Sequence, residues 1–190
     1  KENTISFQDY NYKKNITGIL PIMVKKLLEE REKYQKEMKT HNRDSVEYKT
    51  LDLLQYSIKR INNSIYGVVG SIYFRLYSYI IAKTITTFGQ YLIKKIINKT
   101  NKMGLKVIYS HTDSIFMLYY NLSYSEIENL QSTFTKYCEE CVKEIGVESP
   151  SLSLDFEKIY QGVLFTGVAN RYAGLIKYEG GKELKEPRLE

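Results

Sequence analysis

The sequence predicts an α+β fold in which a helical hairpin and further helices accompany a small antiparallel sheet. Three observations support this prediction. Apolar residues recur at helical spacing over most of residues 18–100. The pattern then changes to two short β-rich arms around a polar tip, within residues 106–119. After one more helical stretch, apolar and polar residues alternate over residues 152–166, as they do in strands.

The composition excludes several classes of protein. The 190 residues are 43% hydrophobic and 26% charged, which is typical of an ordinary folded chain with one core and two small lobes. No apolar run approaches the ~20 residues of a membrane span, and no signal-peptide core follows the N-terminus. We therefore expect no membrane contact and an intracellular location, in the nucleus or the cytoplasm, with a viral origin left open. The net charge of +6 favours a polyanionic partner without proving one.

The first half of the chain is predicted to contain an antiparallel helical hairpin. Residues 1–15 are polar and are expected to be irregular. A first helix is predicted to begin beside Pro21, because proline is harmless in the first turn, where its missing N–H has no partner to lose. This helix continues through the almost wholly charged residues 29–39. After a polar turn at residues 40–45, the second helix is expected from residue 46 to residue 66.

A third, mostly apolar helix is expected after the hairpin. Gly67 and Gly70 are predicted to break the second helix, since glycine disfavours a helix interior. The third helix is then predicted from residue 72 to residue 100, and Gly104 is its predicted stop.

The polar tip is predicted to join two strands, at residues 106–110 and 115–119. A further helix should start just after Ser123, because Ser123 and Glu126 have the spacing of a capping box. Gly146 is the expected end of this helix.

The remaining chain is predicted to return to β structure, with strands at residues 152–159 and 162–166, while residues after Tyr178 carry no clear pattern. The only two cysteines, Cys138 and Cys141, lie on the apolar face of the preceding helix. Because a zinc site needs four ligands, we interpret them as buried or half-buried thiols in a reducing compartment.

A polar stripe on the second helix is the first candidate site. Gln55, Lys59, Asn63 and Tyr66 follow one another at steps of four, four and three, so they occupy an arc no wider than ~80°. An amide, an ammonium and a phenol on one face suit a planar anionic ligand. The alternative is a solvated helix face with a half-buried tyrosine.

The hairpin tip is the second candidate site, since residues 111–114 read His-Thr-Asp-Ser between two strands. Asp113 is a candidate metal ligand, because carboxylate oxygen suits hard divalent cations. Further along, Asp155 and Glu157 alternate with apolar residues and should share one face of a strand. Solvent-facing strand carboxylates are the alternative for these two.

These features together resemble the active-site motifs of family B DNA polymerases. The second-helix residues that match the family's fingers motif are Gln55, Lys59, Asn63, Ser64, Tyr66 and Gly67. Residues 27–33 resemble the first fingers helix, and residues 109–114 resemble the hairpin motif Tyr-Gly-Asp-Thr-Asp-Ser. Residues 171–176 match the end of the motif Lys-Lys-Arg-Tyr-Ala-Gly, and residues 154–158 resemble an acidic palm strand. The motifs follow the family's order and cover most of residues 18–176.

The resemblance implies an enzyme, a DNA-directed DNA polymerase (a nucleotidyltransferase) that transfers a nucleotide from a dNTP to a primer 3′-OH with two Mg²⁺ ions. It assigns triphosphate binding to Arg31 and Lys59, checking of the nascent base pair to Asn63 and Tyr66, and metal binding and catalysis to Asp113. Glu157 is a second candidate at the metals, and Arg171 and Tyr172 would contact primer–template DNA.

The resemblance also implies a subdomain order. Residues 1–17 would be an irregular palm segment, residues 18–68 the fingers, residues 69–178 the palm with the catalytic hairpin, and residues 179–190 the start of the palm–thumb connection. The family's upstream motif, an Asp followed shortly by Ser-Leu-Tyr-Pro-Ser, is absent from this sequence. We therefore expect one metal-binding carboxylate, the exonuclease domain, the rest of the palm and the thumb to come from outside this chain.

The chain departs from the family's pattern at three places. His111 replaces the first Asp of the hairpin motif, Gln35 stands where a Lys is common, and Ala169 and Asn170 replace two Lys. A neutral imidazole is a poor Mg²⁺ ligand, but Asp113 is retained. One alternative is therefore a catalytically impaired polymerase-like module that binds DNA or a partner subunit. A basic RNA-binding protein with coincidental motifs is another.

Overall fold

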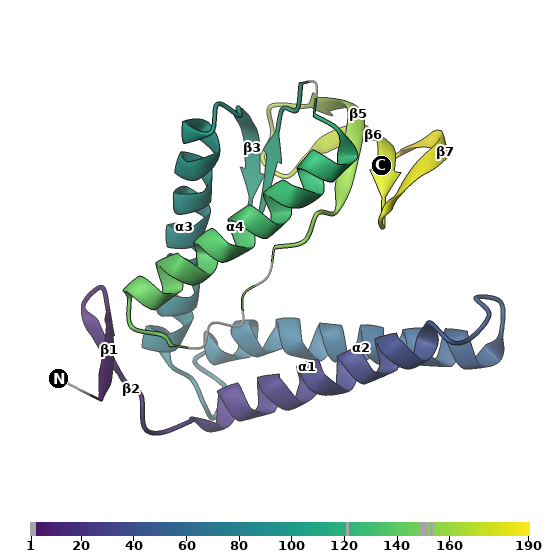
Figure 1. Cartoon of the computed structure of the whole chain (residues 1–190). Helices are drawn as coiled ribbons and strands as arrows, with labels where there is room; N and C mark the ends of the chain where they lie inside the picture. Colours follow the sequence, from purple (N-terminus) through teal and green to yellow (C-terminus); the bar gives the residue numbers. More distant parts are fainter. Residues whose placement is uncertain (1–2, 121, 149–151, 153) are drawn as a thin grey trace. The chain divides into compact units, whose positions relative to one another are not determined.

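The structure is a computed structural model that describes residues 3–120, 122–148, 152 and 154–190 (Figure 1). These residues form four helices and seven strands, and the strands make three small antiparallel sheets. The predicted α+β class is confirmed. The chain divides into two compact units, Lys1–Phe88 and Gly89–Glu190, and each is described by itself. Over the described residues, none of the helices combines the length and apolar character of a membrane-spanning segment.

The first unit begins with a β-hairpin, so the prediction of an irregular N-terminal segment was wrong. Strand β1 (Thr4–Phe7) pairs antiparallel with β2 (Tyr10–Lys13). Gln8 and Asp9 form the turn, and Gln8 has a positive φ of 52°. The first two residues of the predicted segment lie outside the described part of the chain.

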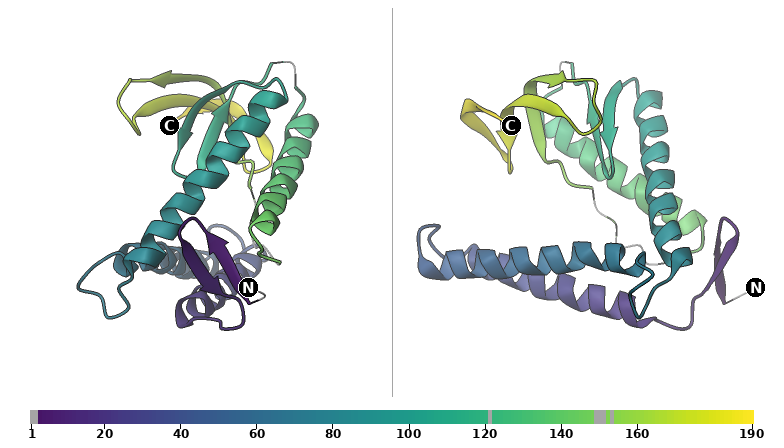
Figure 2. Two further views of the ribbon diagram at one scale, coloured as in Figure 1. Left: turned by 90° about the vertical axis from the view of Figure 1, so that its left-hand side faces the viewer. Right: turned by 180° about the vertical axis from the view of Figure 1, so that it is seen from behind.

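The predicted helical hairpin is confirmed. Helix α1 (Ile19–Met38) and helix α2 (Val46–Val69) run along each other in opposite directions, as Figure 1 and the right-hand view of Figure 2 both show. The Ser45 side chain caps α2 by accepting a hydrogen bond of 3.1 Å from the backbone N–H of Tyr48. Gly67 does not break α2, contrary to the prediction; Gly70 caps its C-terminus instead.

The two helices meet along a seam with heptad spacing. On each helix the buried and half-buried positions of this seam recur at alternating steps of four and three, as in a coiled coil. On α1 they are Leu20, Val24, Leu27, Arg31, Tyr34 and Met38, and on α2 they are Leu51, Gln55, Ile58, Asn62, Ile65 and Val69. Apart from Tyr34, three of these twelve side chains are polar or charged, namely Arg31, Gln55 and Asn62, so the seam is not purely apolar.

Helix α3 (Tyr79–Lys102) starts later than predicted. Residues 71–78 form consecutive turns rather than the first two turns of a helix. Ser78 ends this segment: its N–H donates to the carbonyl of Val69 at 3.0 Å, and its hydroxyl accepts from the N–H of Ile81 at 3.3 Å. The apolar spacing continues through residues 72–78, which is why the sequence pattern placed the helix start too early.

The N-terminal hairpin packs on the first turns of α3. The ammonium group of Lys83 lies 5.8 Å from the ring centroids of both Tyr10 and Tyr79. Phe7 and Phe88 meet edge to face, with ring centroids 5.4 Å apart. Aromatic and cation–π contacts therefore hold this small sheet within the first unit.

In the second unit the predicted hairpin is present: its first strand lies one residue later than predicted, and its second strand begins one residue earlier and ends two residues earlier. Strand β3 (Val107–His111) pairs antiparallel with β4 (Ser114–Met117). Helix α4 (Tyr124–Glu144) then begins with the predicted capping box, in which Ser123 and Glu126 bond each other's backbone N–H groups. Gly146 follows its end with φ 94°, as predicted.

Helices α3 and α4 build the core of this unit on one face of the β3–β4 hairpin. The buried residues of this core are Ile96, Phe134 and Cys138, with Ile115, Met117, Leu130 and Leu154 packed against them. A second cluster joins α4 to the C-terminal sheet through Ile127, Ile159 and Tyr178. Burial of these side chains supplies the main stabilisation of the unit.

The two cysteines are buried free thiols, as predicted. Burial, with the neighbouring Cys141 as a second cause, raises the pKa of the Cys138 thiol to about 11. Cys138 is therefore a protonated core residue at neutral pH rather than a thiolate.

The C-terminal sheet differs from the prediction in its boundaries. The two predicted strands are one strand, β5 (Lys158–Phe165), because bulges around Tyr160 keep it paired through an irregular stretch. Residues 154–157 are not in a strand, and Ser153 lies outside the described residues. Strands β6 (Tyr172–Glu179) and β7 (Lys182–Leu189) complete the sheet in the order β5–β6–β7.

Gly174 in β6 allows a close approach that no other residue permits. A Cβ atom at this position would lie 2.4 Å from Cδ1 of Tyr160. We expect Gly174→Ala to lower the free energy of unfolding by about 1–3 kcal/mol, because the ring must move out of a packed layer. Chemical denaturation followed by circular dichroism measures this. Gly162→Ala on β5 is the control, since a Cβ there meets nothing within 4 Å; equal stability of the two variants would contradict the prediction.

Candidate active site

The tip of the β3–β4 hairpin is a two-residue turn that presents a carboxylate. His111 pairs with Ser114, which leaves Thr112 and Asp113 as the turn. Thr112 has φ 48°, a left-handed conformation that is unfavourable for a β-branched residue. The Ser114 hydroxyl donates to the carbonyl of His111 at 3.1 Å and closes the turn. Asp113 lies at the tip of the hairpin, as predicted, and its side chain is exposed; its assignment as a metal ligand stays a prediction.

An aromatic cluster fixes this hairpin on the β5–β6 pair. Its members, here called the aromatic cluster, are Tyr109, Phe116, Tyr160, Phe165 and Tyr172. Tyr109 lies 5.0 Å from Phe165 and 5.5 Å from Phe116 between ring centroids, and Phe116 stacks on Tyr160 at 5.7 Å. Such ring pairs add about 0.5–1.5 kcal/mol each beyond burial. The hairpin is thus packed on both faces, by the core around Ile96 and Phe134 on one and by the aromatic cluster on the other.

The Tyr109 hydroxyl also bonds the turn between β5 and β6. It accepts a hydrogen bond of 3.1 Å from the backbone N–H of Asn170 and donates to the side-chain oxygen of Asn170 at 3.5 Å. Asn170 has φ 63°, a conformation in which asparagine is one of the best tolerated residues after glycine. Asparagine therefore suits the backbone conformation at this position. Sequence reasoning missed this contact, because 61 residues separate its two partners.

The predicted DNA-contact residues lie at the end of this turn and at the start of β6. Arg171 is exposed, and its carbonyl accepts hydrogen bonds from the N–H of Thr166 at 3.3 Å and from its hydroxyl at 3.0 Å. Tyr172 belongs to the aromatic cluster, 5.2 Å from Phe116. The structure therefore brings the arginine turn and the hairpin that carries Asp113 into one packed assembly.

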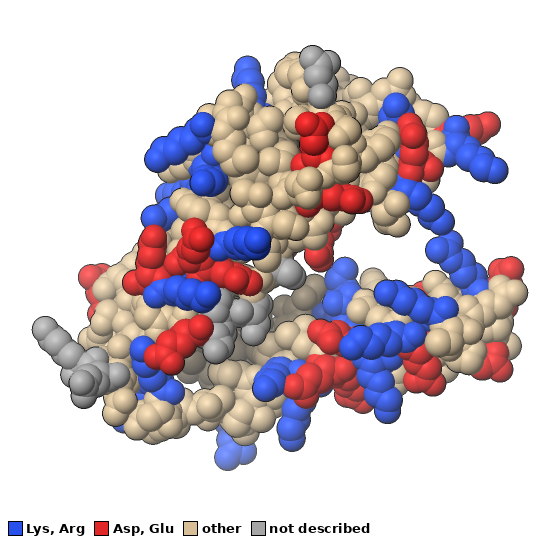
Figure 3. Space-filling model, viewed as in Figure 1, with Lys and Arg blue, Asp and Glu red and all other residues tan. Residues whose placement is uncertain are grey.

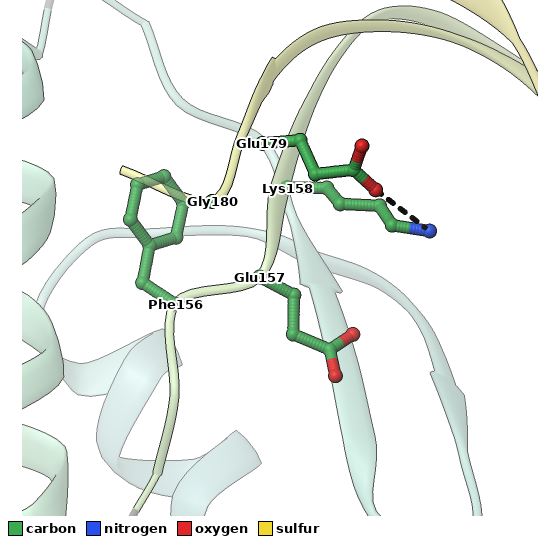
Figure 4. A pocket seen from close by; sticks show the side chains of 5 residues that line it. All are labelled: Phe156, Glu157, Lys158, Glu179 and Gly180. Atoms are coloured by element: carbon green, nitrogen blue, oxygen red, sulfur yellow. Dashed lines mark ion pairs between the residues drawn. The ribbon is translucent and has the colours of Figure 1, made fainter. Parts of the chain in front are cut away.

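Glu157 lies just before β5 with its side chain exposed. In Figure 4 its carboxylate stands apart from the ion pair of Lys158 and Glu179, which measures 3.7 Å. These residues line a shallow pocket of about 350 Å³ together with Phe156 and Gly180. Over the described residues, no three His, Cys, Asp or Glu side chains gather as a metal-binding group. The assignment of Glu157 to the metals stays a prediction.

Tyr160 is held through its hydroxyl as well as through its ring. Its hydroxyl donates to Glu190, which also pairs with Lys158. Burial raises the pKa of Tyr160, and the hydrogen bond to the Glu190 carboxylate raises it further. The phenol therefore stays protonated and keeps its ring fixed beneath Phe116.

The helical hairpin carries the other set of predicted residues. The guanidinium Nε of Arg31 donates to Oε1 of Gln55 across the two helices at 3.3 Å. The Gln35 amide donates to the same oxygen at 3.5 Å, so Gln35 lies beside the seam. The Gln55 amide in turn donates to Asp52 at 2.9 Å. Arg31 is thereby held facing α2.

Lys59, Asn63 and Tyr66 follow Gln55 along α2 and are all exposed. The four residues of the predicted stripe therefore divide: Gln55 turns into the seam, while the other three remain accessible to a ligand. The surface of the helical hairpin is not simply basic, because oppositely charged side chains lie beside each other along α1 (Figure 3). Ion pairs Lys25–Glu29 at 3.9 Å and Lys36–Glu32 at 3.8 Å are examples.

The second unit therefore presents an exposed carboxylate at a hairpin turn packed against the turn that carries Arg171, and the first unit presents ammonium and amide groups on α2. A family model described as DNA polymerase family B matches residues 2–186. The chain belongs to DNA polymerase family B.

Individual relatives agree with the family model. The chain is 32% identical to DNA polymerase 2 of Aeropyrum pernix over 166 residues, and the matched region makes up 87% of this chain. It is 31% identical over 172 residues to DNA polymerase 1 of Pyrococcus abyssi, covering 90% of this chain. The structure of the family B DNA polymerase from Pyrobaculum calidifontis superposes with a TM-score of 0.68 at 27% identity, over 98% of this chain. The chain spans only 19%, 21% and 22% of these three relatives.

Proposed function

We propose that this chain forms the fingers (residues 18–68) and the larger part of the palm (residues 69–178) of a DNA-directed DNA polymerase. Residues 1–17 would belong to the palm, and residues 179–190 would begin the palm–thumb connection. The observation that carries the proposal is Asp113, exposed at a strained two-residue hairpin turn within a family B chain. Strained backbone of this kind concentrates at functional sites.

The proposed roles follow from the chemistry of each side chain. Arg31 and Lys59 bind the triphosphate of the incoming dNTP, because a guanidinium fork and an ammonium are the strongest phosphate donors. Asn63 and Tyr66 contact the nascent base pair. Arg171 and Tyr172 contact the primer–template DNA, the former through phosphate. These roles are supported by the exposure of Lys59, Asn63, Tyr66 and Arg171.

Asp113 fits a Mg²⁺ ligand. Mg²⁺ prefers hard oxygen donors and is commonly held by one or two carboxylates together with substrate phosphates. When bound, it would neutralise charge on the phosphoryl group and activate the primer 3′-OH. We propose that a second carboxylate, an exonuclease domain, the rest of the palm and the thumb are supplied by other parts of the polymerase, in an intracellular compartment. The small share of each relative that the chain spans supports this proposal.

Primer extension by the complete protein tests the proposed function. With a primed template, the four dNTPs and Mg²⁺, we expect template-directed products that disappear when Mg²⁺ is removed by a chelator. Binding of primer–template DNA without any extension would instead support the impaired, DNA-binding module. Absence of both activities would contradict both candidate functions.

We expect His111→Asp to change kcat for primer extension by less than about ten-fold. His111 is half-buried at the end of β3, and its carbonyl is held by Ser114, whereas the exposed carboxylate at the turn is Asp113. The metal-binding role therefore rests on a residue that the variant leaves unchanged. Single-nucleotide incorporation rates measure the effect. A gain of a hundred-fold or more would show that His111 impairs the native enzyme.

A further inference from the structure

Among the described residues, one hydrogen-bonded contact links the β3–β4 hairpin to the turn that carries Arg171. Both ends of this contact lie within the second unit, between Tyr109 on β3 and Asn170 in the β5–β6 turn. The contact has two parts: the Tyr109 oxygen accepts from the Asn170 N–H at 3.1 Å, and its proton points to the Asn170 side chain at 3.5 Å. Neither the aromatic rings nor the strand pairing supplies an equivalent polar link.

The turn has little other polar support. Its remaining hydrogen bonds are internal: the N–H of Arg171 donates to Val168 at 3.2 Å, and Thr166 bonds the Arg171 carbonyl. Asn170 itself is exposed and has a positive φ of 63°. Strand pairing and the aromatic cluster fix the base of the turn at Phe165 and Tyr172, and the Tyr109 hydroxyl adds a polar contact at the turn itself, next to Arg171.

We propose that Tyr109 is a positioning residue that holds Arg171 at a fixed place beside the Asp113 hairpin. Tyr109 stands two residues before His111 on the same face of β3, so its ring is anchored in the aromatic cluster while its hydroxyl reaches the turn. Primer–template DNA bound by Arg171 is then held in register with the carboxylate at the tip. The proposal rests on the proposed function and adds a coupling between its two sites.

Hydrogen exchange tests the structural link without DNA. In Tyr109→Phe the ring contacts are kept and only the hydroxyl is lost. We expect the Asn170 amide to exchange at least about three-fold faster in this variant, because its only described acceptor is gone. The matched control is Tyr178→Phe, which removes the hydroxyl that donates to Glu128 at 3.2 Å in the same unit. Unchanged exchange at Asn170 in Tyr109→Phe would overturn the proposal.

Binding of primer–template DNA by the complete protein tests the function of the link. We expect Tyr109→Phe to weaken binding by about two- to ten-fold and to lower the salt dependence by about one phosphate contact. Arg171→Gln should do the same. In the double variant the losses should not add, because Tyr109 acts through Arg171. Tyr178→Phe should bind as the native protein does.

The outcomes separate this inference from the proposed function. If Arg171→Gln weakens DNA binding and Tyr109→Phe does not, the positioning role is overturned while the proposed function stands. Additive losses in the double variant would also overturn it, because Tyr109 would then act independently of Arg171. If the native protein does not bind primer–template DNA, or Arg171→Gln binds normally, the proposed DNA contact fails and the inference falls with it.

Discussion

Replacing Asp113 with asparagine is expected to lower kcat for primer extension by about a thousand-fold or more. Asparagine keeps the size of the side chain but removes the charge with which the hairpin tip would hold Mg²⁺. Loss of metal-assisted charge stabilisation costs several kcal/mol in the transition state, and each ~1.4 kcal/mol is a factor of ten in rate. Single-turnover incorporation of one nucleotide by the complete protein, with saturating DNA and dNTP, measures this effect.

The N-terminal hairpin offers a closely matched control for this variant. Asp9 is the second residue of a two-residue turn, after a residue with positive φ, as Asp113 is in its own hairpin. Asp9→Asn should therefore retain native activity, which separates loss of the metal ligand from a general effect on hairpin turns. A kcat for Asp113→Asn within ten-fold of the native value would rule out the assignment.

Lys59→Met should raise KM for the incoming dNTP by about ten- to a hundred-fold and should affect kcat less. A hydrogen bond to a charged group contributes about 1.5–3 kcal/mol, and a triphosphate contact made in the ground state appears mainly in KM. Steady-state kinetics at varied dNTP concentration give both constants. Lys59 is exposed on α2, so the substitution removes a solvated charge without opening the seam.

Arg60→Met is the control for the loss of positive charge on this helix. Arg60 is also exposed, but it points about 100° around the helix from Lys59. If both variants raise KM equally, the effect is a general loss of positive potential. Lys59 would then have no specific contact with the triphosphate.

Local signals explain which parts of the fold could be predicted. The capping box at Ser123 and the stop signal at Gly146 act within one helical turn, and both were confirmed. The predicted start of α3 was wrong, because the apolar residues within 72–78 recur at helical spacing. The side chain of Ser78, which caps the helix, was a signal that could have corrected it. The local signals at Ser123 and Gly146 were therefore reliable, whereas the apolar periodicity before Ser78 and the single glycine at Gly67 were not.

In the candidate site, too, features set by adjacent residues could be predicted, whereas contacts between distant segments could not. Asp113 at a hairpin turn follows from adjacent residues, so the sequence was sufficient to predict its position. The bond between Tyr109 and Asn170 depends on two hairpins packing together, and no short-range pattern encodes that contact. The division of the α2 stripe, with Gln55 turned into the seam, likewise depends on the partner helix.

The left-handed backbone at Thr112 lowers the stability of the hairpin tip. Glycine adopts such a conformation freely, so selection for thermal stability alone would favour glycine at this position. A glycine turn would also be looser, since it has more accessible conformations and no side chain to restrict them. Thr112 therefore gives the turn beside Asp113 fewer accessible conformations than a glycine would, at a cost in the stability of the fold.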